Sequence, residues 1–157
     1  MPASLGPIAT AIPTGTTYVV TNTNASDAGS LPHAINIANA NPGKDTIVFN
    51  IPGTGPHTIT LPSGLGGVYD PVIIDGATQP SYPISGTGAP VIILDGVDGQ
   101  RGIYIEGGDT TIQGLCFIRF SVGIGIGIDN DGGNTIQGNY IGTNISGTAA
   151  LGNGVGV

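Results

Sequence analysis

The feature that most constrains this chain is a four-residue phrase that occurs twice. Thr111–Gly114 reads Thr-Ile-Gln-Gly and returns at Thr135–Gly138, an interval of 24 residues. An alternating segment precedes each copy, at Gly102–Ile105 and at Gly123–Ile126. A unit of roughly 20–25 residues with several short strands cannot close a core alone, but stacked copies share one. The repeat therefore predicts an all-β fold, specifically a right-handed parallel β-helix, or β-solenoid.

Short apolar runs between Gly and Pro turns supply the strands of this prediction. We expect them at 16–21, 46–50, 57–61, 72–75, 91–95, 102–106, 110–120, 122–128 and 134–141. Stacking would place Ile112 over Ile136 and Phe117 near Ile141, in strands that pair in parallel about 4.8 Å apart. A β-sandwich also uses short strands, but it does not predict the repeated phrase.

One helix is expected, over residues 31–40. Ser30 is a favoured N-cap, Pro32 falls in the tolerant first turn, and Asn41–Gly43 ends the helix. One apolar face is formed at helical spacing by Leu31, Ala34, Ile35 and Ala38. Such a helix can cover the open end of a solenoid. We therefore predict a loose lead-in over 1–15, an N-terminal cap over 16–45 and stacked coils over 46–157.

Composition excludes several functions. The formal net charge is −7, with Lys44, Arg101 and Arg119 as the only fixed cations. Nucleic acid requires a basic surface, and anionic membranes disfavour an acidic protein. The longest apolar stretches are too short for membrane insertion. The single cysteine, Cys116, lies in an apolar run and is expected to be a buried, inert thiol.

Several phrases resemble the opening of large secreted bacterial right-handed parallel β-helix repeat proteins, which share the pectate-lyase-like fold. The resemblance covers nearly everything from Tyr18 onward. Its clearest phrases are Gly29–Phe49, Pro71–Pro80 and Gly138–Asn153. It implies export to the bacterial surface or medium and an adhesin-like, structural role more than any chemistry.

The resemblance also implies that the chain is an N-terminal region, because such proteins continue with further coils beyond a position like Val157. The expected partners are further coils of the same chain or identical subunits stacked end to end into filaments, together with a glycan or a cell surface. Met1–Ser4 lacks the pattern of a signal peptide, so export implies that a signal has been removed.

The alternative is an enzyme, the first coils of a polysaccharide lyase or glycoside hydrolase. A lyase needs a base, and Arg101 is the cation nearest to acids along the chain, with Asp95, Asp98 and Glu106 close by. A surface turn explains this single cluster better than a lyase site does. A hydrolase needs two facing carboxyl groups. Asp75 and Asp95 occupy corresponding places in two similar phrases and could align on one face. We favour the other interpretation, in which each Asp ends a strand and hydrogen-bonds the Gly turn that follows.

No cofactor is predicted, because polar turn residues explain the candidate segment without a metal, and calcium is the one alternative left open. Asp129 and Asp131 lie in an oxygen-rich turn that resembles the start of a calcium loop, but the EF-hand pattern fails because Tyr140 stands where a Glu is needed. His33 and His57 lie in different expected elements, which disfavours zinc. The favoured function is therefore a non-catalytic, extracellular structural or adhesive module.

Overall fold

The computed structural model describes residues 14–82, 88–97, 99–121, 126–128 and 132–157. The described strands form three sheets, and every strand pairing within them is parallel. This confirms the all-β class. A β-sandwich, in contrast, is built from antiparallel sheets.

The three sheets are named A, B and C. Sheet A contains β1 (Thr17–Val20), β2 (Asp45–Phe49), β5 (Val72–Asp75), β8 (Thr111–Gln113) and β11 (Thr135–Gln137). Sheet B contains β3 (His57–Thr60), β6 (Ile92–Asp95), β9 (Leu115–Ile118) and β12 (Tyr140–Ile141). Sheet C contains β4 (Gly66–Val68), β7 (Ile103–Ile105) and β10 (Ile126–Ile128).

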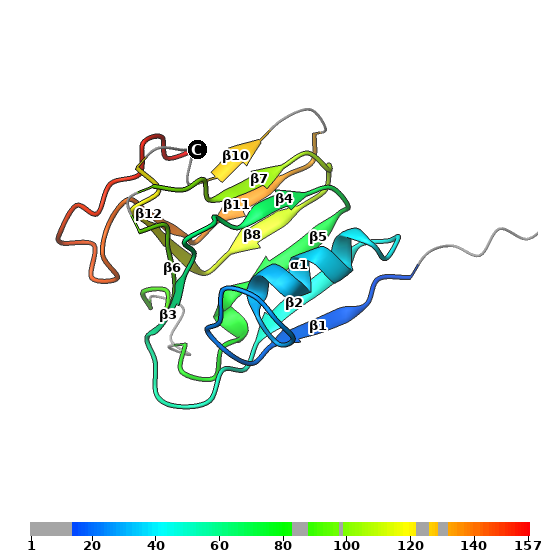
Figure 1. Ribbon diagram of the computed structural model, residues 1–157, viewed down its shortest axis with the longest axis horizontal. Helices are drawn as coiled ribbons and strands as arrows, with labels where there is room; N and C mark the ends of the chain where they lie inside the picture. The colour runs from blue at the N-terminus through cyan, green and yellow to red at the C-terminus, as the bar shows by residue number, and fades with distance from the viewer. Residues whose placement is uncertain (1–13, 83–87, 98, 122–125, 129–131) are drawn as a thin grey trace, which may run out of the picture.

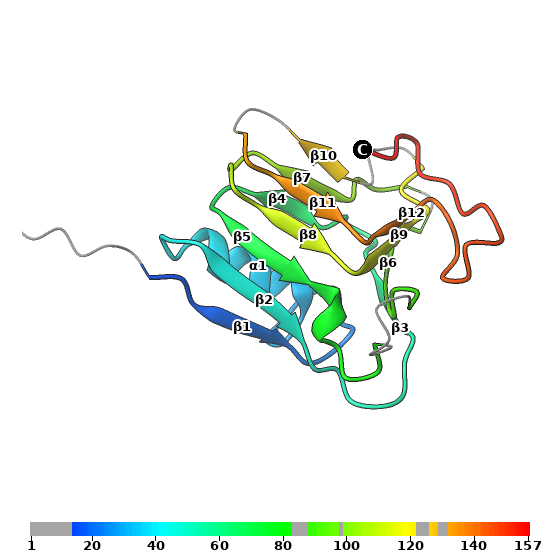
Figure 2. The same cartoon turned by 180° about the vertical axis from the view of Figure 1, so that it is seen from behind.

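From β2 onward the chain visits the sheets in the constant order A, B, C. We call one such passage a circuit: β2 to β4 is the first, β5 to β7 the second and β8 to β10 the third. β11 and β12 begin a fourth. Each strand from β2 to β9 therefore pairs with the strand of the same sheet one circuit later, as Figure 1 and Figure 2 show.

Columns of apolar side chains run across the sheets. In sheet A, Ile47, Ile74, Ile112 and Ile136 are successive register partners. In sheet B, Ile59, Leu94, Phe117 and Ile141 form the corresponding column. The expected pairings of Ile112 with Ile136 and of Phe117 with Ile141 are both confirmed. The inner members are fully buried, whereas the last member of each column is half-buried.

Helix α1 (Leu31–Asn39) packs against β1, β2 and β4. The Ser30 hydroxyl accepts a hydrogen bond from the His33 N–H, so Ser30 is the N-cap as predicted. The four expected apolar residues of the helix are all buried. The Asn39 side chain joins the helix to sheet C, since its Nδ2 donates to the Gly67 carbonyl and its Oδ1 accepts from the Tyr69 N–H.

The expected strands are mostly longer than the observed ones. The run over 110–120 is divided into β8 and β9 at Gly114, where a positive φ of 68° turns the chain from sheet A to sheet B. Gly138 divides the run over 134–141 in the same way, with a φ of 61°. Strand β4 and a short 3-10 helix, η1 (Gly76–Thr78), were not predicted. The lead-in residues 1–13 lie outside the described part of the chain.

Candidate functional site

Side-chain amides connect one circuit to the next at the corners between strands. Asn139 accepts a hydrogen bond from the Leu115 N–H (3.0 Å) and donates to the Ile112 carbonyl (2.8 Å). Asn153 repeats this pattern with the Phe120 N–H (3.0 Å) and the Phe117 carbonyl (3.1 Å). These amides satisfy backbone groups that the strands leave unpaired. These contacts give the two amides a structural role.

Gln79 satisfies a corner on the first circuit in the same manner. It lies in the buried interior, where its Oε1 accepts from the Ile51 N–H and its Nε2 donates to the Ile51 carbonyl. The same Nε2 lies 3.1 Å from the His57 Nε2. His57 therefore belongs to a corner contact in β3, while His33 lies in α1.

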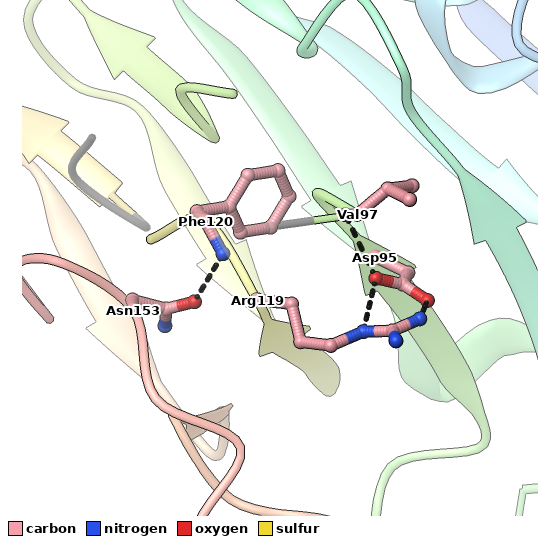
Figure 3. Close-up of polar contacts among 5 residues, drawn as sticks. All are labelled: Asp95, Val97, Arg119, Phe120 and Asn153. Atoms are coloured by element: carbon pink, nitrogen blue, oxygen red, sulfur yellow. Dashed lines mark hydrogen bonds and ion pairs between the residues drawn. The ribbon is translucent and has the colours of Figure 1, made fainter. Parts of the chain in front are cut away.

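The corner after β6 brings Asp95 together with Arg119 from the next circuit (Figure 3). The Arg119 Nε donates to Asp95 Oδ1 at 2.8 Å, and its Nη2 bonds Oδ2. The Val97 N–H also donates to Oδ1, at 3.0 Å. Asp95 is 4% exposed, so this bidentate pair and the turn hydrogen bond occupy both of its carboxylate oxygens.

The pKa of Asp95 reflects opposing influences. Burial of the carboxyl raises it, but the hydrogen bond from Arg119, the hydrogen bond from the Val97 N–H and the charge of Arg119 together hold the pKa below its ordinary value. Asp95 is thus kept ionised inside a structural corner. A carboxylate held in this state is unsuited to act as a general acid.

The alternative in which Asp75 and Asp95 align on one face does not hold. Asp75 ends β5 in sheet A, where its register partners are Val48 and Gln113. Asp95 ends β6 in sheet B, opposite Thr60 and Ile118. The turn interpretation is confirmed for both residues, because each carboxylate accepts from the backbone N–H two residues later.

Arg101 lies apart from this corner, at a pocket of about 450 Å³ on sheet C. The described residues that line the pocket are Ser63, Gly64, Gly66, Gly99, Gln100, Arg101, Gly102 and Tyr104. No carboxylate is among these described lining residues, so within this set Arg101 has none of the acidic partners that a lyase or hydrolase site requires. The pocket instead combines hydrogen-bond donors with one aromatic ring.

The remaining candidates concern metals. Asp129 and Asp131 lie outside the described residues. Within the described part of the chain, no three His, Cys, Asp or Glu side chains gather where they could hold a metal ion.

None of the described helices is long and apolar enough to cross a membrane.

Cys116 is fully buried in β9, and its thiol lies 3.3 Å from the Thr143 carbonyl, to which it donates. Burial raises the pKa of the thiol to about 11. The expected burial of Cys116 is confirmed, and because the thiolate is the reactive form, the raised pKa favours a thiol of low reactivity.

Comparison with models of protein families, with curated proteins and with solved structures finds no match to this chain.

Proposed function

We propose that the chain is a right-handed parallel β-helix that serves as a non-catalytic structural or adhesive module on the outside of a bacterial cell. The observation that carries the proposal is the column Ile47, Ile74, Ile112 and Ile136, in which every circuit contributes one residue to the same interior. A repeat that buries its core only by stacking is typical of a solenoid. The right-handed sense follows the general preference of parallel crossover connections.

The contacts of the buried and half-buried polar side chains support a structural role. Asp95 and Arg119 bind each other, and Asn139 and Asn153 bind the backbone. These four side chains thus hold neighbouring circuits together. The acidic composition suits an extracellular protein of this kind, and α1 is well placed to cap the first circuit.

The edge strands at the end of the stack farthest from α1 support assembly. Among the described strands, β11 and β12 each have a partner strand on one side only, whereas the Ile126 N–H of β10 already donates to the Gly156 carbonyl. An unpaired strand edge is a template for further strands. Further coils of the same chain, or an identical subunit stacked end to end, would complete these sheets and cover the half-buried Ile136 and Ile141.

The proposal is tested by measuring whether the purified chain assembles and whether it binds cells or glycans. Light scattering after size-exclusion chromatography, together with electron microscopy, is expected to show end-to-end oligomers or filaments of the purified chain. Gln137→Lys, on the edge strand β11, should reduce assembly, whereas Gln113→Lys, one strand further in, should not. A strictly monomeric particle that also binds neither cells nor glycans would overturn the proposal, and so would turnover of a polysaccharide that Arg101→Ala abolishes.

A further inference from the structure

The outer face of sheet C carries an unusual column of residues. Gly67, Tyr104 and Gly127 are successive register partners in β4, β7 and β10. An aromatic residue between two glycines has no neighbouring side chains in its column. Its ring can therefore lie down on the sheet instead of standing up from it.

The ring of Tyr104 does lie down in this way. A β-carbon added to Gly127 would meet the Tyr104 Cδ2 at 2.5 Å and its Cε2 at 2.9 Å. The ring therefore rests directly on the Gly127 backbone. Tyr104 also lines the 450 Å³ pocket, so the platform and the pocket belong to one surface.

A second tyrosine occupies the other end of the column. A β-carbon added to Gly67 would meet the Tyr69 Cζ and hydroxyl oxygen, both at 2.5 Å. Tyr69 is 59% exposed, which leaves much of its ring open to solvent. Gly67 and Gly127 are two strand intervals apart, roughly 9–10 Å. Two flat rings at this spacing suit a ligand with more than one ring.

The polar groups at the pocket suit a ligand that carries many hydroxyl groups. Arg101, Gln100 and Ser63 supply guanidinium, amide and hydroxyl groups, which bond hydroxyl-rich ligands. Gly66 leaves its part of the pocket open, since an added β-carbon there would meet nothing within 4 Å. An aromatic ring beside such donors presents an apolar surface and a polar rim together, as sugar rings do.

We infer that the outer face of sheet C binds a neutral oligosaccharide, which stacks its sugar rings on Tyr69 and Tyr104 while Arg101, Gln100 and Ser63 bond its hydroxyl groups. A neutral glycan is favoured because the chain has a net charge of −7, which repels polyanions. This inference rests on the proposed adhesive function and names the ligand class that would serve it.

The test is calorimetric titration of the full chain with cellohexaose, maltohexaose, laminarihexaose and chitohexaose, with polygalacturonate as the anionic comparison. At least one neutral hexasaccharide is expected to bind saturably. Tyr104→Ala should weaken that binding at least tenfold, and Tyr69→Ala should weaken it several-fold. Tyr82→Ala, a matched tyrosine at a different pocket beside sheet A, should leave the affinity unchanged.

Gly127→Ala provides a second variant that keeps the Tyr104 ring but pushes it off its platform, so its binding should also weaken. Unchanged circular dichroism of each variant separates lost binding from lost folding. The inference is overturned if no neutral hexasaccharide binds, if polygalacturonate binds more tightly, or if Tyr104→Ala binds as well as Tyr82→Ala. Assembly and cell binding that persist without hexasaccharide binding would overturn this inference alone and leave the proposed function standing.

Discussion

Ile112 and Ile136 are direct register partners in neighbouring parallel strands, although 24 residues separate them along the chain. Ile112 is fully buried, with Ile74 on its other side. Ile136 packs against the same core but is only half-buried. The two residues thus show how each circuit shields the apolar side chains of the one before it.

Truncation of Ile112 should be costly because it opens a cavity in the middle of this column. Ile112→Ala is expected to lower the free energy of unfolding by about 2–5 kcal/mol. Urea denaturation followed by circular dichroism measures the change. The matched variant Ile128→Ala removes the same atoms from a side chain that is 46% exposed, and should cost about 1 kcal/mol or less. Equal losses in the two variants would argue against the buried column.

Removal of a corner amide should also destabilise the protein. Asn139→Ala leaves the Leu115 N–H and the Ile112 carbonyl without their partner, and we expect a loss of about 1–3 kcal/mol in urea denaturation. Asn144→Ala is the control, because the Asn144 side chain bonds Thr148 and Ala149 within its own loop. The corner would be unimportant for stability if the control cost as much as Asn139→Ala.

The pair of Asp95 and Arg119 should make stability depend on acid pH. The pKa of Asp95 is lowered in the folded protein, so its contribution is present above the unfolded pKa, near 3.9, and is lost as pH falls through the folded pKa. Arg119→Gln removes the partner and should flatten this part of the stability curve. Arg101→Gln removes an equal charge elsewhere and should leave the curve unchanged. Parallel acid-denaturation curves for the two variants would contradict this account.

Cys116 should resist modification in the folded protein. Its pKa of about 11 keeps the thiol protonated at pH 8, and its burial excludes reagents. Reaction with Ellman's reagent at pH 8 is expected to be slow without denaturant and rapid in urea. A rapid reaction in the folded protein would show that β9 is not buried as described.

The repeat was sufficient to predict the stacking partners because identical phrases occupy identical places in successive circuits. Strand β4 was not predictable in this way, since Gly66 and Gly67 carry no strand signal and pair only because a neighbouring strand is present. The column of Gly67, Tyr104 and Gly127 depends on the same registers. It was therefore hidden until the three strands were aligned.

The less favoured interpretation of Asp75 and Asp95 as facing carboxylates failed for a related reason. Asp75 and Asp95 end similar phrases, but they are 20 residues apart, which is less than the repeat interval, and they fall on consecutive sheets. Arg119, which the sequence did not connect with Asp95, lies 24 residues beyond it. The repeat interval itself was thus the signal that could have found the ion pair.

The central claim is the parallel stacking of β8 and β11, and disulfide trapping on their outer faces tests it most directly. One double variant has cysteines at Thr111 and Thr135, and a second has them at Gln113 and Gln137; each pair consists of register partners. The crossed pairs, Thr111 with Gln137 and Gln113 with Thr135, are the controls. Partner Cα atoms in adjacent strands lie within the range a disulfide spans, whereas the crossed pairs of a parallel register do not. The account predicts that Thr111→Cys/Thr135→Cys and Gln113→Cys/Gln137→Cys oxidise readily while the crossed pairs remain reduced. Bridges in the crossed pairs instead, or in none of the four, would contradict it.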